Sequence, residues 1–349
     1  MKILIVGNPE SHHLGSHLVD AANSLEWDNR ILDIRTAWSA NKWVNRFCHH
    51  LLRKRPPAFG EFNQDLLNQC GQWHPNLVLV TGIAPVSAQS LRQLRKLGIL
   101  TVNYLTDDPW NPQNGAGYFW DALREYDLIA NPRQANLDQL RAHGCRRVEY
   151  LPFGYNPSYH FIEPDPTPEE IERFTCQVAI LGGADQDRLP PARVLAATGL
   201  DLALYGGYWE KYKDLRKFHR GHAYGRDLRL AVRLAGVQVC MGRKANRDGH
   251  AMRSLEFPAM GACLVAEQSA EHHALFGSNE DCVLYWQSPA ELVSVVNRLI
   301  NDDAMNSKLR DNLYYRICAG GAHTYANRLL ALGMFLGNSI SGTENHQTY

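Results

Sequence analysis

The sequence predicts an α/β protein with two doubly wound parallel-sheet domains, and three observations support this prediction. Short apolar runs of strand length alternate with helical stretches along most of the 349 residues, which is the pattern of parallel sheets with crossover connections. Several of these runs end in glycine or polar residues, where such sheets bind ligands. The alternation stops in a proline-rich stretch and then restarts, which predicts a second domain.

The first domain is expected over residues 1–155. Each of its strands is a short, mostly apolar run, which is typical of strands buried on both faces of a sheet. Strands are predicted at 2–7, 30–34, 76–80, 99–105, 127–130 and 147–151, with helices at 16–25, 87–97 and 134–143. Residues 156–175 are expected to form a linker, because prolines are frequent there.

The second domain is expected over residues 176–325. Strands are predicted at 176–181, 201–204, 237–241, 263–266 and 282–285, and helices at 190–198, 227–235, 258–260, 289–301 and 304–315. Residues 326–349 are expected to form a C-terminal helix and a polar tail. With two such domains, the cleft between them is the expected ligand site.

The composition excludes several classes of protein. Apolar residues make up 45% and the net charge is zero, so no basic field favours nucleic acid. The eight cysteines lack C-x-x-C spacing, which argues against a zinc site. With no secretion signal at the start, they are expected to be reduced thiols of a cytoplasmic protein. No apolar run approaches the roughly 18–20 residues of a membrane span.

A basic amphipathic helix is expected within residues 38–55. Trp43, Phe47 and Leu51 share one helical face among several cations. Such a helix could rest on an anionic membrane surface. The alternative is packing on its own domain, with the cations reaching out to water.

The stretch from Asp248 to Glu267 is the most informative motif. Asp248, Arg253 and Glu256 precede a small-residue segment and an apolar strand. A helix start with backbone N–H groups suits an anion, and a carboxylate in its first turns can meet hydroxyl groups of the same ligand. This combination favours a nucleotide-sugar, with Glu256 on the ribose and Asp248 on the sugar. Alternatively, Asp248 is a loop residue and Glu256 a charge favoured by the helix dipole.

Basic residues flank the same helix start. Arg243, Lys244 and Arg253 could bind a diphosphate through charge-assisted hydrogen bonds, or form a solvated basic loop. Gly182 and Gly183 end a predicted strand, and glycines allow close approach of a backbone to phosphate. They do not form the G-x-G-x-x-G dinucleotide motif, and an ordinary strand–helix turn explains them equally well.

Polar residues also follow strands of the first domain. Asp107, Asp108 and Trp110 end a buried strand, where a carboxylate could orient an acceptor hydroxyl or take its proton. The alternative is an Asp cap in a turn. His12 and His13 follow the first strand and are expected to line the acceptor side. The spacing of His13 and His17 could suit a metal, but no third ligand is evident, so no metal site is predicted.

Four segments carry a resemblance to a known family: 253–264, 151–157, 107–109 and 323–325. On these segments the chain resembles the CgeB-type spore-maturation glycosyltransferases, within the larger group-1 glycosyltransferases of the GT-B fold. The group-1 pattern has two glutamates separated by seven residues. Glu256 stands at the second position, whereas Asp248 replaces the first.

The resemblance implies two facing Rossmann-like domains, with the nucleotide-sugar donor mainly on the second and the acceptor on the first. It implies sugar transfer to a hydroxyl group without a metal or other cofactor, and retention of stereochemistry only by analogy. Two alternatives stay open: a non-catalytic protein that binds nucleotide-sugars or acts as a scaffold, and a nucleotide-sugar epimerase. Neither the base, the sugar nor the acceptor is specified by the sequence.

Overall fold

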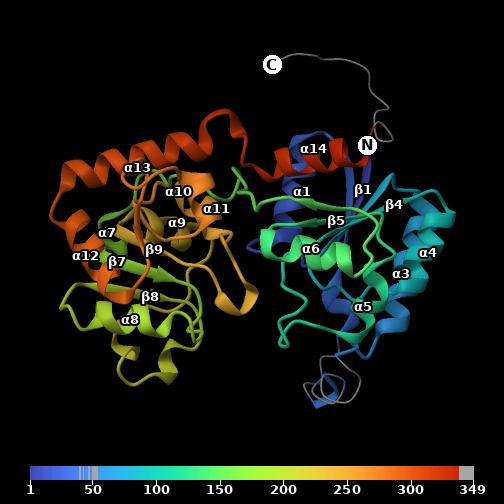
Figure 1. Ribbon diagram of the computed structural model, residues 1–349, viewed down its shortest axis with the longest axis horizontal. Coiled ribbons are helices and arrows are strands. Elements are labelled where there is room, and N and C mark those ends of the chain that lie inside the picture. Colours follow the sequence, from blue (N-terminus) through green and yellow to red (C-terminus); the bar gives the residue numbers. More distant parts are fainter. Residues whose placement is uncertain (39–40, 42, 46–47, 49–53, 338–349) are drawn as a thin grey trace. The chain divides into compact units, whose positions relative to one another are not determined.

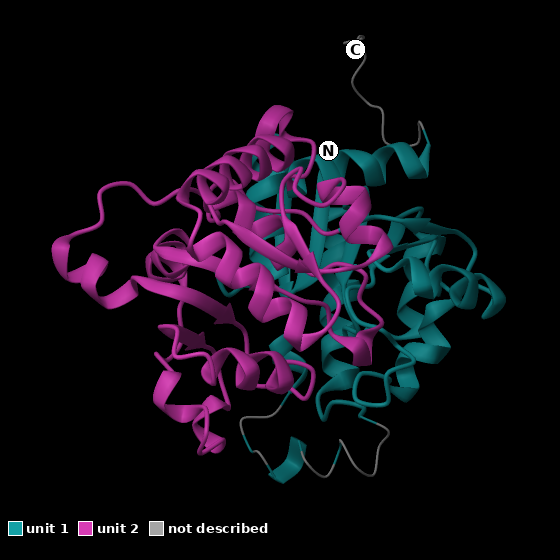
Figure 2. Cartoon of the chain, turned by 60° about the vertical axis from the view of Figure 1, so that its left-hand side comes forward, with its two compact units in different colours: residues 1–152, 325–349 teal, residues 153–324 magenta. Residues whose placement is uncertain are grey.

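The computed structural model describes residues 1–38, 41, 43–45, 48 and 54–337. It contains two compact units, coloured separately in Figure 2. Unit 1 comprises Met1–Pro152 and the chain from Tyr325 onward, and unit 2 comprises Phe153–Thr324. The C-terminal helix therefore belongs to unit 1, although almost half the chain separates it in sequence from the rest of that unit.

Unit 1 is built on a six-stranded parallel sheet with strand order β2-β1-β3-β4-β5-β6. The strands are β1 Lys2–Gly7, β2 Asp28–Asp33, β3 Leu77–Thr81, β4 Leu100–Tyr104, β5 Leu128–Asn131 and β6 Val148–Tyr150. In the central register, Ile3 pairs with Asn29 on one side and with Leu77 on the other. All residues of β3 are buried, because helices cover both faces of such a sheet.

The helices of unit 1 connect these strands, except for α14, which follows unit 2 in sequence (Figure 1). They are α1 Leu14–Ser24, η1 Ile34–Ala37, α3 Phe59–Trp73, α4 Ala88–Lys96, α5 Gly117–Leu123, α6 Gln134–Ala142 and α14 Tyr325–Leu336. Helix α14 packs against α1, where the rings of Tyr325 and His17 stack at 5.9 Å. The sequence did not predict α3 or α5.

Unit 2 contains a five-stranded parallel sheet with strand order β11-β10-β9-β7-β8. The strands are β7 Cys176–Leu181, β8 Leu202–Tyr205, β9 Ala235–Cys240, β10 Leu264–Glu267 and β11 Leu284–Trp286. Successive residues of β7 alternate between two apolar clusters: Val178 and Ile180 belong to one, and Ala179 and Leu181 to the other. Both faces of the sheet are therefore buried, as its continuous apolar runs predict.

The helices of unit 2 are α7 Pro168–Phe174, α8 Leu189–Ala196, α9 Gly225–Arg233, α10 Arg253–Ala259, α11 Ala270–Phe276, α12 Pro289–Ile300 and α13 Asp303–Cys318, with 3-10 turns η2 Trp209–Lys211, η3 Arg216–Phe218, η4 Lys244–Asn246 and η5 Ala319–Gly321. Helix α10 begins five residues earlier than the helix expected at 258–260. Glu256 consequently lies in its first turn.

The segment expected as a linker is packed into unit 2. Thr167 caps α7 in a reciprocal capping box with Glu170. Glu163 is buried and accepts hydrogen bonds from Arg226 and from Arg229, whose Nε lies 2.5 Å from Glu163 Oε2. A buried carboxylate of this kind is stabilised by such paired donors. These contacts tie the segment to α9.

Most of the basic amphipathic helix expected over 38–55 lies outside the described residues, as does the polar tail from residue 338 onward. Among the helices that the structure describes, none combines the length and the apolar character needed to cross a membrane.

Candidate functional site

The turn after β7 is fixed by close packing at both of its glycines. Gly182 has φ +137°, and a Cβ there would lie 3.0 Å from Cζ of Arg188. A Cβ on Gly183 would lie 3.3 Å from the carbonyl oxygen of Gly207. The indole N–H of Trp209 donates to the carbonyl of Gly182 at 2.8 Å. Glycine is therefore required at 182 by backbone conformation and by the neighbouring guanidinium.

Arg188 is a buried cation that the sequence interpretation missed. Its Nη1 donates to the carbonyl of Gly183 at 2.9 Å and to Oδ2 of Asp185 at 2.5 Å. Burial, followed by repulsion from Arg253, lowers the pKa of Arg188 to about 10. The guanidinium is thus charged at neutral pH and lies near other cations. Its position at the start of α8, six residues after the first glycine, was the available signal.

Arg243 and Lys244 lie on the loop after β9, which is tied to the loop after β7. Nε of Arg243 lies 3.6 Å from Oδ2 of Asp185, and the backbone N–H of Lys244 donates to Oδ2 of Asp187 at 2.9 Å. Arg243 also contributes to the lowered pKa of Arg188. Arg188, Arg243 and Arg253, hereafter the arginine group, therefore lie near one another at the carboxyl ends of the strands.

Asp248 follows this loop, and its side chain helps to fix the conformation of the loop. Its Oδ2 accepts the backbone N–H of Arg243 at 3.1 Å. It also lines a cavity of about 120 Å³ beside Lys244 and Glu267. This cavity is smaller than the roughly 300–1,000 Å³ of typical ligand pockets. Burial raises the pKa of Glu267, whose Oε2 accepts the N–H of Gly242 at 3.2 Å.

Glu256 is the most perturbed carboxyl group of the candidate site. Its side chain is 14% exposed, and its Oε1 lies 3.7 Å from Nε2 of His160. Burial raises its pKa to about 7, although Arg253 acts in the opposite direction. Nδ1 of His160 accepts the backbone N–H of Asn156 at 3.1 Å. The proton of a neutral His160 is therefore on Nε2, which faces the carboxyl group. The sequence interpretation did not include His160.

A buried polar network holds the start of α10 in place. Oγ of Ser254 lies 2.8 Å from Nε2 of His272, whose Nδ1 lies 2.6 Å from the carbonyl of Glu267. Burial lowers the pKa of His272 to about 4, so the imidazole is neutral and donates to that carbonyl through Nδ1–H. Ser254 is fully buried. The Ser254–His272 pair is thus a scaffold, not a nucleophile and its base.

Unit 1 has a candidate ligand pocket of its own, at the carboxyl ends of its central strands. A pocket of about 410 Å³ is lined by residues from the loops after β1, β3 and β4. These include Asn8, His13, Gly82, Thr106 and Asp107. Its volume lies within the range of small-molecule sites.

The structure distinguishes Asp107 from Asp108, whereas the sequence did not show which of the two carboxylates would contact a ligand. Asp107 lines the 410 Å³ pocket. Asp108 is buried, and its Oδ1 accepts the backbone N–H of Trp110 at 3.0 Å in a local Asx-type turn. The ring of Trp110 packs edge-on against Trp120 at 5.5 Å and joins the apolar core. Of this motif, Asp107 has the position suited to a ligand.

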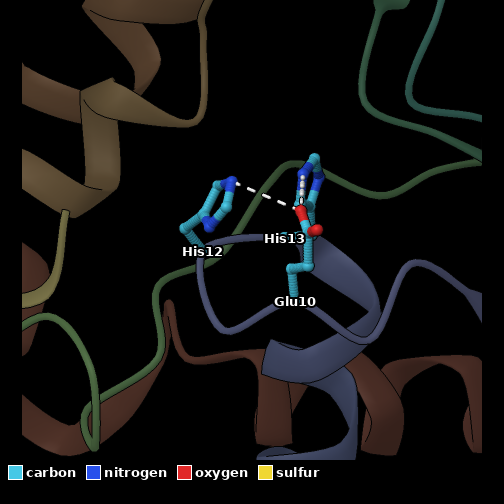
Figure 3. A group of neighbouring side chains, drawn as sticks. All are labelled: Glu10, His12 and His13. Atoms are coloured by element: carbon cyan, nitrogen blue, oxygen red, sulfur yellow. Dashed lines mark ion pairs between the residues drawn. The ribbon is translucent and has the colours of Figure 1, made fainter. Parts of the chain in front are cut away.

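His12 and His13 lie on the loop between β1 and α1, with Glu10 (Figure 3). His13 lines the 410 Å³ pocket. Nε2 of His13 lies 3.3 Å from Oε2 of Glu10, and Nε2 of His12 lies 3.8 Å from the same oxygen. The sequence interpretation did not consider Glu10 as a third member of this group.

Residues 188–332 match the family model described as glycosyl transferase-like. The matched region begins at Arg188 and includes Arg243, Asp248, Arg253 and Glu256. No curated protein sequence matches the chain.

Solved structures show the same fold at low sequence identity. Sucrose-phosphate synthase from Thermosynechococcus elongatus has a TM-score of 0.69 at 14% identity, covering 98% of this chain and 100% of that chain. An Anabaena protein in complex with UDP-glucose has a TM-score of 0.61 at 13% identity, covering 96% of this chain and 100% of that chain. A trehalose 6-phosphate synthase from Burkholderia multivorans has a TM-score of 0.59 at 12% identity, covering 99% of both chains.

The two parallel-sheet α/β units thus form a GT-B fold, as the sequence predicts. The fold and the family match over 188–332 together show an enzyme of the glycosyltransferase type.

Proposed function

We propose that this protein transfers a sugar from a nucleoside-diphosphate-sugar to a hydroxyl-bearing acceptor, and that it belongs to the CgeB-like branch of the group-1 glycosyltransferases. The observation that carries the proposal is the arginine group beside the buried Glu256 carboxyl in unit 2. Cations and a carboxyl group at the carboxyl edge of a parallel sheet suit a ligand with both phosphate and hydroxyl groups.

The diphosphate is bound by Arg188, Arg253 and Arg243, with Lys244 as a further cation. The energetic argument is that Arg188 is already desolvated and repelled by its neighbours. An anion at this place relieves the repulsion, and each charge-assisted hydrogen bond contributes about 1.5–3 kcal/mol. The same cations stabilise the charge that develops on the departing diphosphate, so transfer proceeds without a metal at the phosphates.

Glu256 binds the ribose hydroxyl groups. Because burial raises its pKa to about 7, the empty site holds a mixture of carboxylic acid and carboxylate near neutral pH. A ribose hydroxyl that donates to the carboxylate replaces lost solvation. Asp248 binds the transferred sugar from the loop that also carries Arg243, and Gly182 and Gly183 shape the wall beside Arg188.

Asp107 orients the acceptor hydroxyl in the 410 Å³ pocket of unit 1, beside His13. We assign this role to Asp107 and not to Asp108, which is engaged in the Trp110 turn. Retention of stereochemistry is part of the proposal through the family resemblance. The eight free cysteines, seven of them buried, support a reducing, cytoplasmic location.

A thermal-shift panel of UDP-, GDP-, ADP- and dTDP-sugars tests the donor site. A nucleotide-sugar at about 100 times its Kd should stabilise the protein by roughly 2.7 kcal/mol. Arg188→Gln should reduce that shift by at least about half, and Glu256→Ala should abolish it. The exposed Arg298→Gln, which removes a surface pair with Glu280, is the matched control and should keep it.

Turnover separates the proposal from its two alternatives. Sugar transfer or slow donor hydrolysis supports the enzyme, whereas binding without any turnover supports a nucleotide-sugar-binding scaffold. Conversion of the donor to its epimer with no acceptor present supports an epimerase. A donor shift that survives in both variants would show that the nucleotide-sugar binds elsewhere.

A further inference from the structure

Three side chains with metal-binding atoms converge on the loop between β1 and α1. The backbone N–H of His13 donates to the carbonyl of Glu10 at 2.8 Å, so a tight turn brings residues 10 and 13 together. The side chains of Glu10, His12 and His13 are 45%, 33% and 44% exposed. Figure 3 shows both imidazoles directed toward the Glu10 carboxylate.

The spacing of the ligand atoms suits a small cation. One atom from each side chain lies within 4.8 Å of the other two. With metal–ligand distances of about 2.0–2.1 Å, tetrahedral ligands lie roughly 3.3 Å apart. Oε2 of Glu10 is already 3.3 Å from Nε2 of His13 and 3.8 Å from Nε2 of His12. Small rotations of exposed side chains are enough to complete the set.

The second oxygen of Glu10 is held by a neighbouring ion pair. Oε1 accepts Nη1 of Arg35 at 2.6 Å, and Arg35 in turn binds Asp33 through Nε and Nη2. Such outer partners orient ligating carboxylates in metal sites. One arginine between two carboxylates leaves one net negative charge on the three residues. The local charge therefore does not oppose a cation.

We propose that Glu10, His12 and His13 bind a divalent first-row transition metal ion such as Zn²⁺. Two imidazoles and one carboxylate are a common ligand set for this class of ion, and three protein ligands leave at least one position for water or a ligand oxygen. Because His13 also lines the 410 Å³ pocket, the three residues lie beside that pocket. The site lies on a different unit from the proposed diphosphate residues, and it does not depend on the proposed function.

Isothermal titration of the EDTA-treated full chain with ZnCl₂ tests the site. We expect the parent to bind one equivalent that is lost in the His12→Ala/His13→Ala double variant. Affinity should fall at least about tenfold in Glu10→Gln. The exposed His222→Ala is the matched control and should bind like the parent. Circular dichroism of each variant checks that the exposed substitutions leave the fold intact.

Two further measurements define the ligand chemistry. Co²⁺ should give the visible absorption of a four- or five-coordinate site in the parent but not in the double variant. MgCl₂ should give no binding here, because Mg²⁺ prefers oxygen ligands. Zn²⁺ bound with unchanged stoichiometry and affinity by the folded double variant would overturn the proposal, as would a parent that binds none.

Discussion

Replacing Glu256 by glutamine should stabilise the protein at high pH, although the proposal places this residue in the donor site. Burial raises the pKa of its carboxyl group from 4.5 to about 7. A group whose folded pKa is raised contributes stability that is fully present below the unfolded pKa. That contribution is lost as pH rises through the folded value. In the parent, the loss therefore falls between about pH 4.5 and pH 7.

The magnitude follows from the shift. About 2.5 pKa units at 1.36 kcal/mol each give roughly 3 kcal/mol at pH 8. Glu256→Gln cannot ionise, so it avoids this cost while it keeps an oxygen near His160. Its advantage over the parent should approach 3 kcal/mol at pH 8 and shrink below about 1 kcal/mol at pH 5.

Urea unfolding at pH 5 and pH 8, without nucleotide, measures this difference. Glu280→Gln is the control, because the Glu280 carboxylate is exposed and its pKa is lowered by Arg298; that variant should gain no stability at pH 8. If the free energies of unfolding of Glu256→Gln and the parent differ by the same amount at both pH values, burial does not raise the pKa of the Glu256 carboxyl group as described.

Four further substitutions address the other parts of the candidate site. Arg188→Gln should lose at least about 1.5 kcal/mol of diphosphate binding, read as a weaker Kd for UDP in calorimetry; an unchanged Kd would remove Arg188 from the donor site. Asp107→Ala should reduce sugar transfer without changing donor binding. Asp108→Ala should instead lower the free energy of unfolding by about 1 kcal/mol, because the Trp110 N–H loses its acceptor. If the two variants reduced transfer and stability to the same extent, the different roles given to Asp107 and Asp108 would be wrong. Gly182→Ala should cost about 1–3 kcal/mol of stability from its positive φ, and a variant as stable as the parent would show that the turn adapts.

The strands could be predicted because each is a short apolar run between turn residues. All eleven strands of the two sheets lie where the sequence places them, within a few residues at their ends. Helix α3 was missed although Phe62, Leu66 and Cys70 form its buried stripe. The polar Asn63 lies on the same buried side, and Gly60 and Gly71 lower the helix propensity, so the sequence marks this helix only weakly. Helix α5 is only seven residues long and follows a loop rich in proline and asparagine.

The candidate site was only partly accessible from the sequence. The sequence indicates site residues when polar groups that suit one ligand lie close together along the chain, as Glu256 and Arg253 do. It could not rank Asp107 against Asp108, because the difference arises from a hydrogen bond to Trp110. Arg188 and His160 were not predicted, because they are recognised as site residues only by their burial and by the groups that they contact. Both properties depend on packing between segments far apart in the chain.

The packed segment between Phe153 and α7 limits where the chain can be cut to isolate unit 2. A fragment that starts at Cys176, the first residue of β7, would lack His160 and Glu163. Arg226 and Arg229 would then lose the carboxylate that pairs with both of them, and the part of α9 that the segment covers would be exposed to water. A fragment that folds on its own must therefore begin before Glu163, and truncations that remove Glu163 should show a sharp loss of soluble yield.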